Sequence, residues 1–202
     1  MPELLFILIP LFLIGMGVMA YYSHLQAKQR REELSQLAQR RGWRFEHSHD
    51  AEWDSRYSQF SWFNTGHSRY AYNFLHGQLR IEGRNVPSVA GDYTYKVTSG
   101  TGKNRKTTTY YFSFLLVELP FRGLPQLAVR PEGFFDSVTS FFGFDDIDFE
   151  SEEFSRKFHV KSSDKRFAYD LLHARMMEFM LASPTASFEM ERDVFCLKSQ
   201  KK

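Results

Sequence analysis

The feature that most constrains this chain is an uncharged apolar segment near its start, LLFILIPLFLIGMGVMAYY, over residues 4–22. At about 1.5 Å of rise per residue, an α-helix of this length is roughly 28 Å long. The hydrocarbon core of a bilayer is about 30 Å thick. Proline and glycine, present here as Pro10, Gly15 and Gly17, are tolerated in membrane helices. We therefore predict a transmembrane helix over residues 4–22.

Two alternatives to a membrane span remain open for this segment. A buried core helix would also be apolar all round. A cleaved signal peptide needs small residues at the positions that the peptidase reads, and Val18 and Ala20 provide them. Signal peptides usually begin with a positively charged region, whereas residues 1–3 include no Lys or Arg. We therefore favour the uncleaved span.

Basic residues follow the apolar segment directly, and none precedes it. They are Lys28, Arg30, Arg31, Arg40, Arg41 and Arg44. By the positive-inside rule, this asymmetry predicts a single-pass membrane protein whose N-terminus lies outside and whose globular domain lies in the cytoplasm.

Residues 23–42 are predicted to form a basic juxtamembrane helix, with Gly42 as its C-terminal cap. Its candidates for contact with lipid or a partner are Lys28, Arg30, Arg31, Arg40 and Arg41. Near an anionic membrane surface, each such cation contributes up to about 1 kcal/mol. The alternative, which we favour, is that these charges only stop translocation and keep the helix solvated.

Composition narrows the class of domain that follows. The 202 residues are 43% hydrophobic and 17% aromatic, which excludes intrinsic disorder and supplies a sizeable core. The formal net charge is only +2, so the clustered basic excess of nucleic-acid-binding proteins is missing. The single cysteine, Cys196, cannot form an internal disulfide, which favours a reducing compartment.

Residues 43–198 are predicted to form one α+β domain, a mostly antiparallel sheet followed by C-terminal helices. Short runs of aromatic and branched residues between glycines and prolines are typical of antiparallel strands. The predicted strands cover residues 43–46, 68–76, 78–82, 89–98, 107–119, 127–130, 158–162, 187–191 and 194–197. One or two helical turns are expected over residues 134–142. A longer helix begins after Ser163 or Asp164 as its cap and ends before Pro184.

The loop over residues 99–106, SGTGKNRK, invites comparison with a phosphate-binding loop. The spacing fails, because Val97 and Asn104 stand where that motif requires a glycine and a Ser or Thr. The loop also joins two predicted strands, so we favour a flexible hairpin loop. Its cations Lys103, Arg105 and Lys106 are candidates for contact with an acidic partner or lipid.

Two groups of residues offer potential metal ligands, but neither has the complete ligand set of a known metal site. The acidic run over residues 145–153 lacks the glycine and glutamate spacing of a calcium-binding loop, and we favour an extended segment with its carboxylates in water. His47, His49 and Asp50 lack a third defined ligand, and we favour a solvated loop. We therefore predict no metal site.

Motifs of catalysis are also missing from the sequence. A nucleophile elbow, a metalloprotease helix, paired cysteines and a dinucleotide fingerprint are all absent, so we predict no catalytic residue and no cofactor. Cys196 lies in an apolar terminal strand, which favours a buried, inert thiol. Aromatic residues at 60–63, 134–135 and 141–142 can line a groove for an apolar ligand or peptide, or touch a bilayer, although most aromatics must be core.

Four segments carry a resemblance: LAQRRGWRF, GTGKNRKT, LPQLAVRPEG and ESEEFSRKFHVKSSDKRFAYDLLHARMMEFML. Together they resemble a widespread family of uncharacterised bacterial single-span membrane proteins that contain a domain of unknown function. The match covers most of the chain and is most specific over residues 151–160. It departs at Ala174, where the family has proline, which leaves a break between two helices open. The resemblance implies the bacterial inner membrane and brings no catalytic residues.

Three functions remain open from the sequence. We favour a non-enzymatic, membrane-anchored module that binds another protein or acts as a scaffold at the inner face of the membrane, with no nucleic-acid partner. The first alternative is a domain that binds lipid or a small ligand. The second is an unrecognised hydrolase, which would need a carboxylate or histidine cluster assembled in space.

Overall fold

The computed structural model describes the backbone of residues 2–132 and 144–200, and the side chains of residues 21–132 and 144–199. The chain divides into two compact units, Met1–Phe45 and Glu46–Lys202. The helical turns predicted over residues 134–142 lie outside the described residues.

The first unit consists mainly of one continuous helix, α1 (Pro2–Arg41). Its C-terminus is closed as the sequence predicts, because Gly42 adopts a φ of +65°, which favours glycine. The amide of Trp43 then donates to the carbonyl oxygen of Ala38 at 2.8 Å, a bond typical of a glycine-capped helix end. The boundary expected near residue 22 does not interrupt the backbone.

The predicted transmembrane helix over residues 4–22 requires correction. The side chains of residues 2–20 lie outside the described part, and within that part no helix is long and apolar enough to cross a membrane. From Tyr21 to Arg41 the helix carries charges of both signs, which are costly in a bilayer core. The predicted fold class, which begins with a membrane-spanning helix, is therefore wrong. The single-pass topology and the inner-membrane location derived from it are overturned with it.

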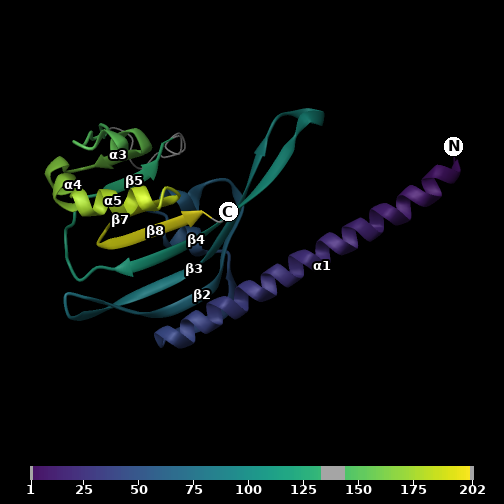
Figure 1. The fold of residues 1–202 in the computed structure, drawn as a ribbon, viewed down its shortest axis with the longest axis horizontal. Helices are drawn as coiled ribbons and strands as arrows, with labels where there is room; N and C mark the ends of the chain where they lie inside the picture. Colours follow the sequence, from purple (N-terminus) through teal and green to yellow (C-terminus); the bar gives the residue numbers. More distant parts are fainter. Residues whose placement is uncertain (1, 133–143, 201–202) are drawn as a thin grey trace. The chain divides into compact units, whose positions relative to one another are not determined.

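The second unit is built on an eight-stranded sheet in the order β1-β2-β3-β4-β8-β7-β5-β6 (Figure 1). Its strands are β1 (Arg44–Asp50), β2 (His67–Ile81), β3 (Arg84–Ser99), β4 (Lys106–Glu118), β5 (Leu127–Pro131), β6 (Phe158–Ser162), β7 (Ala186–Glu191) and β8 (Val194–Gln200). The pairs from β2 through to β6 in this order are all antiparallel. The first half is a meander, and the later strands add to its far edge.

Several strands are longer than predicted. The runs 68–76 and 78–82 form the single strand β2, in which Gly77 pairs with Ser88. Pro87, which the sequence suggests as a breaker, lies inside β3 opposite Gln78. The hairpin of β7 and β8 is confirmed, and Arg192 and Asp193 turn it with φ values of 51° and 63°.

Short helices connect and cover the strands. They are α2 (Trp53–Arg56), η1 (Ser61–Asn64), η2 (Gly102–Asn104), α3 (Glu152–Lys157), α4 (Lys165–Leu171) and α5 (Ala174–Ala182). The single helix predicted after Asp164 is divided, because His173 leaves the helical region with a ψ of 168°. Its carbonyl oxygen then accepts from Met176 and Met177 as a new helix begins. The break left open at Ala174 is thus present without proline.

Asp164 is confirmed as the N-cap of α4. Its Oδ1 accepts hydrogen bonds from the amides of Arg166 at 2.9 Å and Phe167 at 3.2 Å. We expect Asp164→Ala to lower the free energy of unfolding by about 0.5–2 kcal/mol, because two amides lose their acceptor. Asp164→Asn, which keeps an acceptor oxygen, should cost much less. Urea denaturation of both variants checks this, and equal costs would contradict a capping role.

The sheet carries one core on each face, since side chains alternate along a strand. One core contains Phe63, Phe112, Phe114 and Cys196 and is covered by α2 and η1. The other contains Phe154, Phe158, Phe188 and residues of α4 and α5. The helices α3, α4 and α5 lie together beside β5 and β7 (Figure 1).

Candidate functional site

Two hollows lie on opposite faces of the sheet in the second unit, and β8 contributes to both. Lys198 lines a polar pocket, while Phe195 lines an apolar groove. Residues an odd number of positions apart on a strand point to opposite faces. The partners in register agree, because Lys198 pairs with Ser187 of the pocket and Phe195 pairs with Met190 of the groove.

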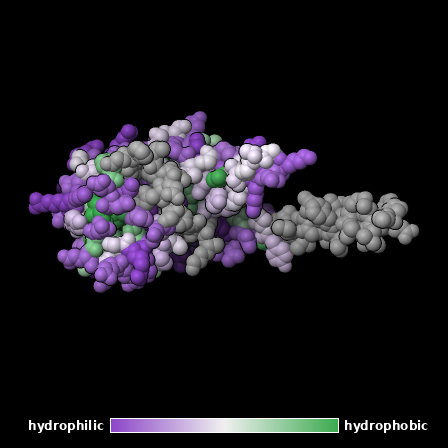
Figure 2. Space-filling model, turned by 90° about the horizontal axis from the view of Figure 1, so that it is seen from above, coloured by the Kyte–Doolittle hydropathy of each residue, from purple (hydrophilic) through white to green (hydrophobic). Residues whose placement is uncertain are grey.

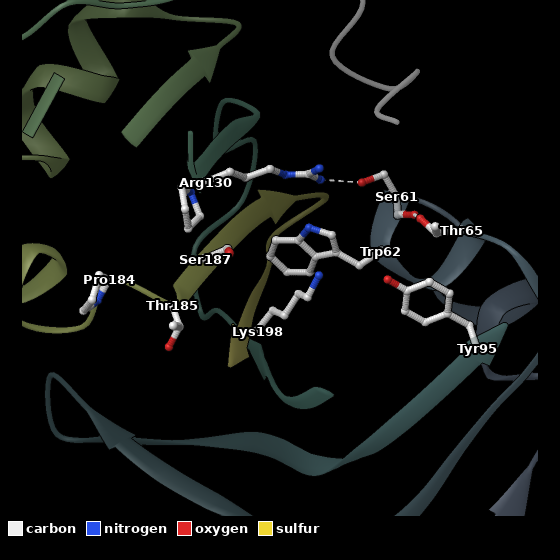
Figure 3. A pocket seen from close by; sticks show the side chains of 10 residues that line it. Ser61, Trp62, Thr65, Tyr95, Arg130, Pro184, Thr185, Ser187 and Lys198 are labelled. Carbon is white, nitrogen blue, oxygen red and sulfur yellow. Dashed lines mark hydrogen bonds between the residues drawn. The ribbon is translucent and has the colours of Figure 1, made fainter. Parts of the chain in front are cut away.

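The polar pocket has a volume of about 190 Å³. It lies between η1, the ends of β5 and β8, and the segment that leads into β7 (Figure 3). Its lining residues are Ser61, Trp62, Thr65, Tyr95, Arg130, Pro131, Pro184, Thr185, Ser187 and Lys198. Hydroxyl groups, two cations and one indole ring therefore face a small volume.

A buried ion pair forms one wall of this pocket. The side chains of Arg130 and Glu189 are 3% and 1% exposed, and the guanidinium contacts the carboxylate Oε1. The hydroxyl of Ser61 donates to the same Oε1 at 3.1 Å and accepts from Arg130 (Figure 3). Burial lowers the pKa of Arg130, but the adjacent carboxylate keeps the guanidinium charged at neutral pH. The pair is thus electrically neutral as a whole.

Lys198 supplies a second cation to the pocket. Its Nζ lies 5.6 Å from the ring centroid of Trp62 and 4.8 Å from that of Phe112, within cation–π range. Arg130 stands over the same Trp62 ring at 5.1 Å. Burial, and then repulsion from Arg130, lower the pKa of Lys198 to about 8. At pH 7 the ammonium is still mostly protonated.

The groove on the other face has a volume of about 430 Å³, and every described residue that lines it is apolar. They are Leu79, Ile81, Leu115, Val117, Leu119, Phe121, Leu124, Phe167, Leu171, Met176, Met190 and Phe195. Sheet residues form its floor, and the connection from β4 to β5, α4 and α5 form its sides. In the space-filling view, hydrophobic residues show at the surface at the left end of this unit, the end where Figure 1 places α4 (Figure 2).

A third cluster joins polar side chains across four strands. His47 Nδ1 lies 2.8 Å from Asn73 Oδ1, and Asn73 Nδ2 donates to Asp92 Oδ2 at 3.1 Å. The Ser113 hydroxyl donates to Asp92 Oδ1 at 2.7 Å. A hydrolase would pair the serine with the histidine as its base, whereas Asn73 and Asp92 lie between them. The cluster therefore gives the hydrolase alternative no nucleophile and base pair.

The predicted basic contact residues fall into two groups that belong to different units. Lys28, Arg30, Arg31, Arg40 and Arg41 lie on α1, and Lys28 pairs with Glu32 at 3.9 Å. Lys103, Arg105 and Lys106 are exposed at the β3–β4 hairpin loop, which confirms the hairpin over the phosphate-loop reading. None of the eight lines either hollow. Their contact with lipid or a partner stays a prediction.

The remaining candidates from the sequence are the potential metal ligands and Cys196. His47 and His49 lie in β1 instead of a loop, and the ring of His49 packs on Tyr70 at 4.0 Å. No group of three His, Cys, Asp or Glu within the described ranges can hold a metal ion. In the acidic run, Ile147 is buried as expected, while Asp145 stays exposed. Cys196 is fully buried as predicted, and burial raises its pKa.

Sequence reasoning missed most of the polar pocket. Among the described residues, Trp62 alone of the predicted groove aromatics lines the pocket, and Phe60 and Phe63 beside it are core. A usable signal was present, because Glu189 lies between Phe188 and Met190 in β7, and Lys198 follows the apolar run that begins β8. Charged residues at such positions are rarely buried unless they are paired. Their partners, however, come from β5 and η1, which the sequence does not connect to β7.

One solved structure has a similar fold. The crystal structure of the mycobacterial trehalose monomycolate transport factor A, TtfA, matches with a TM-score of 0.57 at 11% sequence identity. The match covers 84% of this chain and 81% of TtfA. No protein-family model and no curated protein matches the chain, so the resemblance drawn from the sequence stays a prediction. At this identity the likeness to TtfA extends to the fold alone.

Proposed function

We propose that this protein binds the acyl chain of an amphiphilic lipid in the apolar groove. The observation that carries the proposal is the lining, in which none of the described residues is polar or charged across about 430 Å³. Pockets for small ligands measure about 300–1,000 Å³ and are mostly apolar with a few polar groups. A groove without any polar group is matched best by a ligand segment that has none.

The energetics of the groove favour an apolar occupant. Leu79, Leu115 and Phe195 are only partly buried, and Phe121 is 38% exposed. Removing apolar surface from water contributes about 25 cal/mol per Å². An acyl chain laid against these side chains removes surface on both partners at once. Met176 at the groove's side adds an adaptable thioether side chain, which suits variable chain shapes.

The edge of the groove carries charges of both signs. Arg122, Arg166 and Arg175 are exposed and stand next in sequence to lining residues, but so do Glu118 and Asp170. This mixture selects no particular headgroup charge. The proposal is therefore restricted to the apolar chain of the ligand.

The structural neighbour gives independent support. TtfA is named as a transport factor for trehalose monomycolate, so a lipid-related role is associated with a protein of similar fold. A shared fold does not by itself transfer a function, and the lining of the groove remains the main argument.

The test is a binding assay on the full chain with dansylaminoundecanoic acid, whose fluorescence rises in an apolar site. We expect saturable binding that palmitate displaces. Met176→Lys should weaken binding by about 10-fold or more, because it places a charge in the apolar lining. Lysine and methionine have similar helix propensities, so α5 itself is preserved.

Phe179→Lys is the matched control. Phe179 lies on the same helix three residues away, is 56% exposed and does not line the groove. It should bind the probe as the wild type does. Dansylglycine, which has the same fluorophore and carboxylate without the chain, should not bind in the groove. Equal loss in both lysine variants, or no saturable binding by the wild type, would overturn the proposal.

A further inference from the structure

Among the described residues, the polar pocket on the opposite face holds one positive charge more than its carboxylates balance. Arg130 is neutralised by Glu189. Lys198 contacts only the rings of Trp62 and Phe112 through its Nζ, and no carboxylate pairs with it within the described ranges. Both cations stand over the same Trp62 ring. An added negative charge would relieve their mutual repulsion while both stay protonated.

Hydroxyl groups converge on the same space. Tyr95, Thr185 and Ser187 line the pocket, and none forms a hydrogen bond to another side chain drawn in the close-up (Figure 3). Burial raises the pKa of Tyr95, so its hydroxyl remains a donor at neutral pH. Hydroxyl donors beside a cation are the groups that recognise an oxyanion.

We propose that this pocket binds the carboxylate of a small organic acid, with Lys198 as the counter-charge and Trp62 as the apolar wall beside it. The volume of about 190 Å³ is below the usual range for drug-sized ligands, so the ligand is small. An organic acid fits better than an inorganic anion, because the indole and the prolines Pro131 and Pro184 offer apolar surface to the rest of the ligand.

This site is separate from the groove that carries the proposed function. The sheet lies between the two hollows, as the pairs Ser187–Lys198 and Met190–Phe195 show. Binding of a small acid in the pocket therefore does not depend on whether the groove binds an acyl chain. Each site can be removed by a substitution that leaves the other in place.

The affinity of this pocket for an anion should depend on pH. The anion requires the protonated ammonium, and the pKa of Lys198 is lowered to about 8 by burial and by Arg130. Affinity should be full below pH 7 and should fall as the pH rises through this value. For a single group with this pKa, the protonated fraction falls about 10-fold between pH 7 and pH 9.

The experiment is isothermal titration of the full chain with benzoate at constant ionic strength, because benzoate keeps its charge over this pH range. We expect binding at pH 7 that weakens about 10-fold at pH 9. Lys198→Gln should weaken it by about 10-fold or more at pH 7 and remove the pH dependence. Lys96→Gln, an exposed lysine on β3 outside the pocket, is the matched control and should bind as the wild type does.

Two further arms separate the outcomes. Benzyl alcohol has the ring without the charge and should bind much more weakly than benzoate. Met176→Lys alters the groove and should leave benzoate affinity unchanged. Benzoate binding that is independent of pH, or equal in wild type and Lys198→Gln, would overturn the proposal, as would the absence of binding at millimolar concentrations. If Lys198→Gln fails to fold, the pH profile of the wild type still decides.

Discussion

Glu189→Gln is expected to lower the free energy of unfolding by about 3–5 kcal/mol, because it leaves a buried guanidinium without its counter-charge. Arg130 and Glu189 are both almost fully buried. The Ser61 hydroxyl donates to the same carboxylate, so the substitution also disturbs a third group. Urea denaturation followed by circular dichroism measures the loss.

Two further variants serve as comparisons for Glu189→Gln. Glu153→Gln removes the carboxylate of an exposed pair, Lys157–Glu153 at 2.6 Å, and should leave stability close to that of the wild type, since exposed pairs contribute little. The double variant Arg130→Met with Glu189→Leu should be markedly more stable than Glu189→Gln, because no unpaired charge remains. A single substitution at Glu189 that costs no more than the exposed one would show that the pair does not stabilise the fold.

Phe63→Ala is expected to cost about 3–5 kcal/mol, as usual for removal of a fully buried phenylalanine ring. Phe63 has no exposed surface. Its ring lies 4.9 Å from Tyr93, 5.4 Å from Phe114 and 6.0 Å from Phe112, measured between centroids. The alanine leaves a cavity among rigid rings that cannot close around it.

The matched control for this prediction is Phe179→Ala, which removes the same ring from an exposed position on α5. It should change the free energy of unfolding by less than about 0.5 kcal/mol. Phe63→Leu should fall between the two, since it refills most of the cavity. A loss below about 1 kcal/mol for Phe63→Ala would contradict the central place of this ring in the core.

Local patterns predicted local structure well. The cap at Asp164, the turn at Arg192–Asp193 and the glycine stop at Gly42 are each decided by neighbouring residues, and each was confirmed. Strand β6 was predicted with its observed bounds. Gly77 and Pro87 were interpreted as strand breakers, but they lie inside β2 and β3, where Gly77 pairs with Ser88 and Pro87 pairs with Gln78.

The apolar segment at the start shows the opposite outcome. Its length and lack of charge favoured a membrane span, but over the residues whose side chains the structure describes, from Tyr21 on, the helix has no segment apolar and long enough to cross a membrane. The helix α1 does not end with the apolar segment but continues through charged residues up to Arg41.

Caps, turns and strand alternation could be predicted from the sequence alone, because they depend on residues within a few positions of one another. No role for Glu189 or Lys198 followed from the local pattern. Only the tertiary structure decided that Arg130 and Trp62 meet them on one face while Leu79, Met176 and Phe195 form a groove on the other. The reason is the strand order, which places β8 between β4 and β7 and brings together residues far apart in the chain.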